Sequence, residues 1–215
     1  MYLISTYTHQ VKSYCEDKFF NRFMELDADK IVVDNTPGMD YAKHLTKYGS
    51  PVHHLEISKE PNNTRFLRSV SDSANHVRDY FLDGAWSYLV IIESDVIVPK
   101  SLLNLFDEAI AMAEKWGAIG GYYYRGWHDF DKWGTQPYED KRCKSLKKTQ
   151  HVLSGCTVYH RDVIELFKFK WDYENLEAFP DAWICHDINT RTNKNLYDYP
   201  KIICTHESDK KGKRH

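Results

Sequence analysis

The sequence has no long apolar run, no Cys-x-x-Cys pair and almost no net charge, and each absence argues against a class of protein. No stretch approaches the roughly 18 consecutive apolar residues that a membrane-spanning helix needs. Lysines and arginines number 29 against 31 aspartates and glutamates, so the whole-chain charge favours neither nucleic acid nor anionic lipid. The five cysteines are odd in number and scattered, which indicates reduced thiols and predicts a cytoplasmic protein.

Several sequence motifs are also missing. There is no G-x-x-x-x-G-K-[ST] loop, no G-x-G-x-x-G fingerprint and no G-x-S-x-G elbow, which argues against P-loop enzymes, dinucleotide oxidoreductases and serine hydrolases. Residues 1–6 enter a strand pattern directly, with no basic stretch before an apolar run, so we expect no signal peptide. The basic tail, residues 209–215, is interpreted as a solvated chain end rather than a contact with a polyanion.

What the sequence does contain is an alternation of two apolar patterns. Its 215 residues, 42% of them hydrophobic, suffice for one domain with a substantial core. Short apolar runs predict buried strands, and apolar residues at spacings of three and four predict helices between them. This alternation predicts a doubly wound, largely parallel α/β sheet. We expect strands at 2–6, 30–35, 53–57, 86–92, 120–124, within a hairpin at 151–160, and at 201–205, and helices at 19–26, 64–84, from 101, at 161–169 and at 180–192.

Two carboxylates end the most apolar of these strands. Glu93 and Asp95 follow the run Leu89-Val90-Ile91-Ile92 with one residue between them. Carboxylates at the end of a buried strand are costly unless a positive charge neutralises them. In such sheets ligands bind beyond the carboxyl ends of strands, and hard oxygen ligands suit Mg²⁺ or Mn²⁺. The pair therefore predicts a divalent metal site that also binds phosphates; the alternative is a solvated turn.

The segment around this pair resembles the central block of family 2-like glycosyltransferases of the GT-A fold. In that family an Arg-Asn pair lies on the helix before the strand, and a D-x-D motif holds the metal and the diphosphate. Here Ser73 stands in place of the usual Arg, Asn75 follows it, and Glu93 replaces the first Asp, whereas Asp95 keeps the normally metal-binding last position. The resemblance implies a GT-A fold with a doubly wound mixed sheet, in which Asn75, Glu93 and Asp95 contact the donor or its metal.

Other blocks are similar to the same family in the same order. Residues 3–6 resemble its first strand and residues 32–35 its second, which implies that Ser5, Thr6 and Asp34 hold the nucleoside. Residues 153–161 look like its acceptor-side segment.

The later segment 180–206 resembles the family's Glu-Asp pair, helix, strand and closing histidine. Asp181 falls on the catalytic base of inverting members, and His206 falls on the third ligand near the metal. Pro180 departs from the usual Glu.

Elementary chemistry supports these roles. A metal held by Asp95, with Glu93 or His206, would stabilise the charge that builds on a departing diphosphate. An acceptor hydroxyl is a poor nucleophile and needs a base, for which Asp181 is the first candidate and Asp187 the second. Six residues apart, they lie roughly 240° around a helix, so one helix face does not present both. The alternatives are a helix N-cap for Asp181 and an exposed strand-end side chain for His206.

Two further side-chain sets contain residues of functional types. A zinc site built from Cys185, His186, Cys204 and His206 is disfavoured, because no ligand pair has the short spacing of structural zinc motifs. Trp127 and Trp133 fall in a long polar segment, residues 127–148, and are candidates to line an acceptor cleft.

The sequence therefore predicts a metal-dependent glycosyltransferase. A donor half, residues 1–99, would bind a nucleoside-diphosphate sugar with Mn²⁺ or Mg²⁺, and an acceptor half, residues 100–208, would direct a hydroxyl to the sugar with inversion. The acceptor is open between a saccharide, a protein, a lipid headgroup and a hydroxymethylated DNA base. One alternative is a nucleotidyltransferase, which needs a Gly-rich basic loop after the first strand that residues 6–10 lack. The other is a non-catalytic nucleotide-sugar-binding module.

Overall fold

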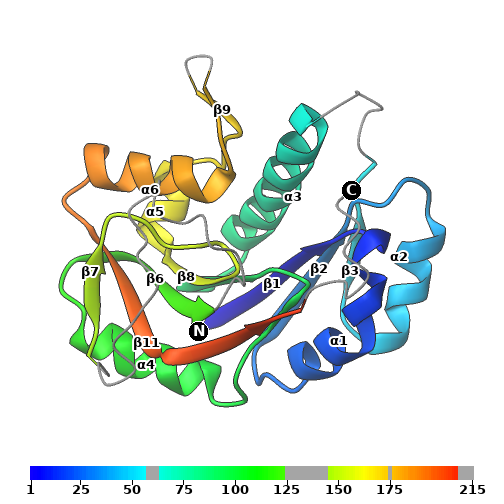
Figure 1. Ribbon diagram of the computed structural model, residues 1–215, viewed down its shortest axis with the longest axis horizontal. Coiled ribbons are helices and arrows are strands. Elements are labelled where there is room, and N and C mark those ends of the chain that lie inside the picture. Colours follow the sequence, from blue (N-terminus) through cyan, green and yellow to red (C-terminus); the bar gives the residue numbers. More distant parts are fainter. Residues whose placement is uncertain (57–62, 124–144, 174–175, 208–215) are drawn as a thin grey trace.

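The fold is a mixed β-sheet with helices on both faces (Figure 1). The computed structural model describes residues 1–56, 63–123, 145–173 and 176–207. The helices are α1 (Glu16–Met24), α2 (Asp40–Leu45), α3 (Asn63–Asp83), α4 (Leu102–Met112), α5 (Arg161–Leu166) and α6 (Pro180–Arg191), with 3₁₀ turns η1 (Gln10–Cys15) and η2 (Thr46–Tyr48). The strands are β1 (Tyr2–Thr8), β2 (Asp29–Asp34), β3 (Val52–His54), β4 (Tyr88–Ile92), β5 (Val96–Ile97), β6 (Trp116–Tyr123), β7 (Lys147–Thr149), β8 (Cys156–His160), β9 (Asp172–Tyr173), β10 (Leu176–Glu177) and β11 (Asn195–His206).

The strand order places a topological switch point in the middle of the sheet. The order is β3-β2-β1-β4-β8-β6-β11-β5. The first four strands run parallel, and β8 is inserted antiparallel between β4 and β6. From β1 the chain moves outward to β2 and β3 and then returns to β4 on the other side of β1. Sheets of this kind bind ligands beyond the carboxyl ends of the strands at the switch point, which here are β1 and β4.

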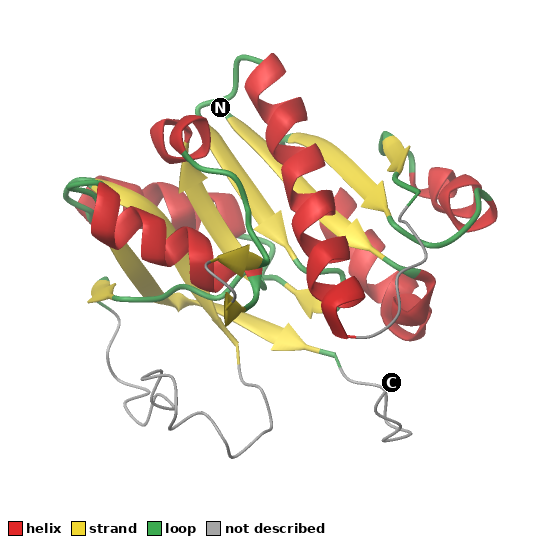
Figure 2. Cartoon of the chain, turned by 90° about the horizontal axis from the view of Figure 1, so that it is seen from above, coloured by secondary structure: helices red, strands yellow, loops and turns green. Residues whose placement is uncertain are grey.

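Two hydrophobic cores cover the two faces of the sheet. On one face α1, α2 and α4 bury Phe19, Phe20, Phe23, Tyr41, Leu45, Leu102, Phe106 and Ala109. On the other, α3, α5 and α6 bury Ala74, Val77, Phe81, Val163, Ile164, Ile184, Cys185 and Ile188. Figure 1 shows these helix sets on opposite sides of the sheet, and Figure 2 shows α3 lying along the parallel strands. Strand β4 supplies both cores in alternation, Leu89 and Ile91 to one and Val90 and Ile92 to the other, as expected for a strand covered on both faces.

The last strand is longer than the sequence indicates. The sequence predicts a strand at 201–205, but β11 begins at Asn195 and pairs in parallel with β6. Pro200 lies between Asp198 and Ile203, where the register of this pairing shifts; proline, which has no N–H to donate, is tolerated at such an irregularity. The neighbouring Gly121 is required here, because a Cβ on it would lie 2.6 Å from the side chain of Ile202.

Other expectations need correction at their ends. Strand β1 runs to Thr8 rather than Thr6. Helix α5 stops at Leu166 because Phe167 has an extended backbone. The hairpin expected at 151–160 is a single strand, β8, preceded by a turn at 154–155. The sheet is mixed rather than largely parallel, which agrees with the implied GT-A fold. Trp127, Trp133 and the tail 209–215 lie outside the described residues.

Among the described residues, no helix is both long enough and apolar enough to span a bilayer.

A carboxylate at the irregularity of β11 has an unusual pKa. Burial of Asp198 raises its pKa from 3.8 to about 7, and a hydrogen bond with Thr149 and the charge of Lys147 lower it only in part. Lys147 lies opposite Asp198 in the β7–β11 register. Between about pH 4 and about pH 7 the folded chain therefore holds a proton that the unfolded chain has released.

We predict that the free energy of unfolding falls as the pH rises from about 4 to about 7 and that Asp198→Asn abolishes most of this fall, about 1–3 kcal/mol. A raised carboxyl pKa has this sign because the folded state binds more protons than the unfolded state in that interval. Thermal unfolding of both proteins at about pH 5.5 and about pH 8 measures the difference. Asp83→Asn, at an exposed position, is the control, and an equal pH dependence in wild type and Asp198→Asn would contradict the prediction.

Candidate functional site

The end of β4 and the end of β11 meet through a short antiparallel pairing. Strand β5 follows Asp95 directly, and Val96 pairs with His206 in the β5–β11 ladder. The Glu207 N–H then donates to the Asp95 carbonyl at 2.8 Å. Figure 2 shows β11 lying along the end of the sheet at which the parallel strands finish. This backbone pairing is what carries His206, from the end of the chain, to the carboxylates after β4.

Glu93, Asp95 and His206 form a three-ligand cluster. One potential ligand atom from each lies within 4.8 Å of the others, and His206 Nε2 is 3.5 Å from Asp95 Oδ2. Asp95 is 2% exposed, and its Oδ1 is buried without a hydrogen-bond partner. A buried carboxylate oxygen with no partner is costly, and two carboxylates with one imidazole are a donor set that a divalent cation accepts. The residues present therefore fit the metal that the sequence predicts.

A lysine supplies positive charge at this cluster. The Lys12 ammonium on η1 contacts Asp95 Oδ2 in an ion pair, and the Tyr14 hydroxyl lies 3.4 Å from the same oxygen. The thiol of Cys15 also lies here, 3.4 Å from the Ser94 carbonyl. Burial and then the charge of Asp95 raise the pKa of Cys15 to about 11, so it stays a neutral thiol. Within the described part of the chain, neither Cys185 nor Cys204 joins a metal-ligand cluster, and both are buried.

Ser154 connects Glu93 to Asp181. The β4–β8 pairing sets the Glu93 N–H 3.1 Å from the Gly155 carbonyl. The Ser154 hydroxyl donates to Glu93 Oε1 at 2.6 Å, and the Ser154 N–H donates to Asp181 Oδ2 at 3.1 Å. Asp181 opens α6 just after its N-cap, and its Oδ1 accepts from the Ala182 N–H at 2.9 Å. Ser154 thus bonds both Glu93, one of the three potential metal ligands, and Asp181, the first candidate base.

Asp187, the second candidate base, lies in a different environment. It is 2% exposed, and Lys170 donates to its Oδ2 at 2.8 Å while Arg191 donates to its Oδ1 at 3.3 Å. Both oxygens are engaged in ion pairs with lysine and arginine. The contacts of Asp187 are therefore those of a structural ion pair, whereas those of Asp181 lead through Ser154 to Glu93.

The residues expected to hold the nucleoside lie around the ends of β1 and β2. Asp34 is fully buried; its Oδ1 accepts from the Thr36 N–H at 2.9 Å, and its Oδ2 lies 3.2 Å from His54 Nδ1. Ser5 donates to the Val90 carbonyl at 2.9 Å. Thr6 Oγ1 is buried without a hydrogen-bond partner. Because β1 continues to Thr8, the backbone of Ser5 and Thr6 lies inside the sheet ladder rather than at its edge.

Asn75 is bonded to the segment after α5. Its side-chain Nδ2 donates to the Phe169 carbonyl at 2.7 Å, and its Oδ1 accepts from the Phe169 N–H at 2.9 Å. Ser71 donates to the same carbonyl at 2.7 Å. These bonds give the Phe169 backbone, which lies in no helix or strand, the partners that a buried chain needs. In the structure both ends of the Asn75 amide thus bond the Phe169 backbone; the donor-binding role of Asn75 stays a prediction.

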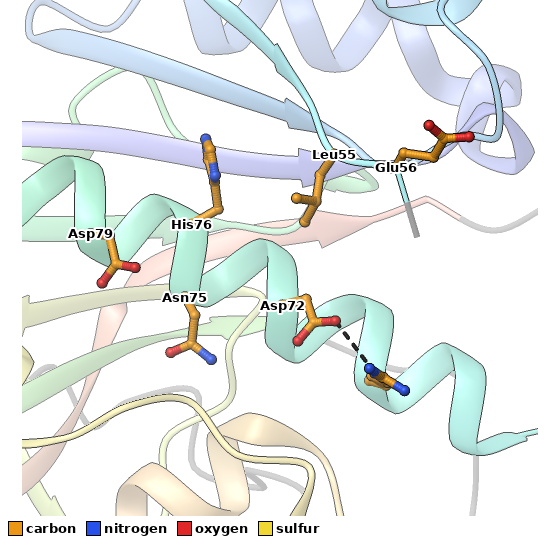
Figure 3. Close-up of a pocket in the computed structure, with 7 residues that line it drawn as sticks. Leu55, Glu56, Asp72, Asn75, His76 and Asp79 are labelled. Carbon is orange, nitrogen blue, oxygen red and sulfur yellow. Dashed lines mark ion pairs between the residues drawn. The ribbon is translucent and has the colours of Figure 1, made fainter. Parts of the chain in front are cut away.

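Asn75 also lines a cavity of about 380 Å³ between α3 and the residues that follow β3. Figure 3 shows Leu55 and Glu56 across from the helix, with Asn75 and His76 projecting from α3 in different directions. The cavity contains the carboxylates of Glu56, Asp72 and Asp79, and its one arginine, Arg68, is paired with Asp72 at 3.6 Å. This lining carries more negative than positive charge, so it does not suit a diphosphate.

Three contact residues were not among the predicted site residues: Lys12, His54 and Ser154. Lys12 follows β1 and looks like an ordinary surface lysine in the sequence. His54 pairs with Asp34 in the β2–β3 register, and a two-residue histidine run gives no usable spacing. Ser154 lies in the segment that resembles the family's acceptor side, which was the one available signal.

No known protein-family model and no curated protein matches the chain, but solved structures do. The mannosyltransferase PcManGT from Pyrobaculum calidifontis, in complex with GDP-Man and Mn²⁺, matches 98% of this chain and 58% of its own, with a TM-score of 0.66 at 12% identity. S. aureus TarS 1–349, in complex with UDP-GlcNAc, matches 100% of this chain and 61% of its own, with a TM-score of 0.61 at 13% identity. The chain thus spans about three fifths of these two neighbours.

A third match is glucosyl-3-phosphoglycerate synthase from Mycobacterium tuberculosis, in complex with Mn²⁺, UDP and glucosyl-3-phosphoglycerate. It covers 97% of this chain and 72% of its own, with a TM-score of 0.58 at 11% identity. The chain therefore has the GT-A fold implied by its sequence.

We predict that Asn75→Ala lowers the free energy of unfolding by about 1–3 kcal/mol, because it removes both bonds to the buried Phe169 backbone. Urea unfolding measures the loss. Asn189→Ala is the control, since Asn189 makes one bond to a backbone carbonyl, that of Gln150, at an exposed position. A stability equal to that of wild type would show that the clamp contributes nothing.

Proposed function

We propose that this chain is a metal-dependent glycosyltransferase that transfers a hexosyl or pentosyl group from a nucleoside-diphosphate sugar to an acceptor hydroxyl, with inversion. The observation that carries the proposal is the Glu93–Asp95–His206 cluster at the switch point of a GT-A sheet, with one Asp95 oxygen buried and unpartnered. Structural neighbours captured with GDP-Man and Mn²⁺ or with UDP-GlcNAc support the same class of donor.

Asp95, Glu93 and His206 would hold Mn²⁺ or Mg²⁺. When bound, the cation offsets the negative charge of the donor diphosphate and of the nucleoside diphosphate that departs. The chain's contribution is orientation: Ser154 fixes Glu93, and the β5–β11 pairing fixes Asp95 against His206. Positioning of this kind precedes the reaction and lowers its entropic cost.

The nucleoside would lie beyond β1 and β2. Asp34, which Thr36 and His54 hold in one orientation, would accept hydrogen bonds from the base or ribose. Ser5 and Thr6 belong to the strand that leads there, and Thr6 Oγ1 has a free hydrogen-bonding capacity. Asn75 would contact the donor through the hydrogen-bonding capacity that its two bonds to the Phe169 backbone leave unused.

Asp181 is the proposed base. Its carboxylate takes the proton of the acceptor hydroxyl as the acceptor oxygen bonds to the anomeric carbon and the bond from that carbon to the diphosphate breaks. The nucleoside diphosphate leaves with the electron pair. The Ser154 and Ala182 N–H groups hold the carboxylate in place. Asp187, engaged by Lys170 and Arg191, is the less favoured base.

The acceptor stays open between a saccharide, a protein, a lipid headgroup and a hydroxymethylated DNA base. A nucleotidyltransferase or a binding module would use the same cluster differently. Release of nucleoside diphosphate and free sugar from a donor without acceptor distinguishes a glycosyltransferase from both.

We predict that Mn²⁺ with GDP-mannose or UDP-N-acetylglucosamine raises the thermal stability of the wild-type chain and that Asp95→Asn does not respond. A ligand at about 100 times its Kd stabilises by about 2.7 kcal/mol, and the variant loses the buried carboxylate that grips the cation. A thermal-shift series with and without Mn²⁺ measures this, with Asp83→Asn as control. An Asp95→Asn protein with the full wild-type shift would remove the metal assignment.

We further predict that Asp181→Asn lowers hydrolysis of the stabilising donor by about 10²–10⁴-fold, with little change in donor binding, because a general base acts on the nucleophile and not on the donor. Released nucleoside diphosphate is the readout, with water as the nucleophile. Asp187→Asn, checked for folding, is the comparison. A larger loss in Asp187→Asn than in Asp181→Asn would exchange the two assignments.

A further inference from the structure

Lys12 contacts the same carboxylate, that of Asp95, that the proposed cation would bind. Its ammonium contacts Asp95 Oδ2, the same oxygen that faces Tyr14 and His206. The side chain of Lys12 is 31% exposed while that of Asp95 is 2% exposed, so the lysine reaches a buried carboxylate from the protein surface.

The segment that carries Lys12 is fixed at several points. The Gln10 N–H donates to Thr36 Oγ1 at 2.8 Å, and the Cys15 thiol donates to the Lys12 carbonyl at 3.2 Å. Beyond η1, Lys18 pairs with Glu207, whose N–H bonds the Asp95 carbonyl. The backbone at Lys12 is therefore anchored over the cluster, and the four-carbon side chain is the part that can move.

A lysine ammonium and a divalent cation cannot both sit against Asp95 without strong repulsion. Like charges at contact distance repel strongly where the effective dielectric constant is below that of water, and a divalent ion doubles the charge on one side. Either the cation binds weakly while Lys12 keeps its contact with Asp95, or the Lys12 ammonium moves away from Asp95. A donor diphosphate bound beside the cation would give the released ammonium a new partner.

We propose that Lys12 is a built-in counter-ion: it neutralises Asp95 while no cation is bound, and it transfers its contact to the donor diphosphate when the cation and the nucleotide bind. The inference rests on the proposed function, since it uses the same cluster. It adds Lys12 as a donor-binding and positioning residue, and it makes cation and nucleotide binding cooperative.

The cooperativity follows from linkage. Without nucleotide, Mn²⁺ must displace Lys12 from Asp95, which weakens its binding. With nucleotide present, the displaced ammonium is accepted by the diphosphate. Each ligand therefore strengthens the other by the same factor, which for coupled sites is typically about 5–150-fold.

Electron paramagnetic resonance of free Mn²⁺ tests this on the full chain, first alone and then with UDP or GDP. We expect Lys12→Met to bind Mn²⁺ alone at least about fivefold more tightly than wild type and to gain correspondingly less from the nucleotide. Lys12→Arg, which keeps the charge, should behave more like wild type. Lys18→Met is the matched control. Lys18 pairs with Glu207, so this substitution removes a nearby positive charge without freeing Asp95.

The outcomes separate this inference from the proposed function. Equal or weaker Mn²⁺ binding by Lys12→Met, in a protein with wild-type circular dichroism, overturns the role of Lys12. An equal gain in Lys18→Met also overturns it, because the effect would then be general charge. Asp95→Asn is run in parallel: if it binds Mn²⁺ as wild type does, the metal site itself is elsewhere, and both proposals fail. If Asp95→Asn loses Mn²⁺ binding while Lys12→Met binds Mn²⁺ as wild type does, only the counter-ion role of Lys12 is overturned.

Discussion

The need to neutralise one buried carboxylate organises the functional end of this molecule. Asp95 is 2% exposed and follows a strand buried on both faces, where an unpaired charge would be strongly destabilising. The chain responds from three directions: η1 brings Lys12, β11 brings His206 and β8 brings the turn that orients Glu93. Each contact comes from a segment distant in sequence. The position of Asp95 at the switch point thus fixes where the last strand and the first turn must pass.

Many of the helices and strands that form this arrangement were predictable from local apolar patterns. The run before Glu93 has no polar residue to face solvent, which is typical of a strand covered on both faces. The apolar face of α3 is similarly local, and both α3 and α6 are found where expected. What local pattern misses is pairing between distant strands. The antiparallel insertion of β8, the length of β11 across Pro200 and the extension of β1 to Thr8 all depend on which neighbour supplies hydrogen bonds.

The same limit applies to the site. Glu93, Asp95 and His206 were predicted as metal ligands, and the structure brings them together. The sequence could not reveal that Lys12 contacts Asp95 or that His54 meets Asp34, because both depend on strand register and on the path of a turn. Nor could it reveal that both ends of the Asn75 amide bond a backbone segment. The residue type at a position determines which hydrogen bonds and charges it can supply. The fold determines how many of them are already engaged within the protein.

Ser154 bears on how the two halves of the chain could act together. Glu93 follows a strand of residues 1–99, the proposed donor half, and Asp181 begins a helix of residues 100–208, the proposed acceptor half. The hydroxyl of Ser154 bonds Glu93, and its N–H bonds Asp181. Because the N–H and the hydroxyl belong to one residue, Ser154, their relative position changes only by rotation about the bonds that join them. The separation between the proposed cation site and the proposed base is therefore set by the turn at 154–155, which β8 holds against β4. An in-line transfer requires such a fixed separation, because the base and the leaving diphosphate act on opposite sides of one carbon.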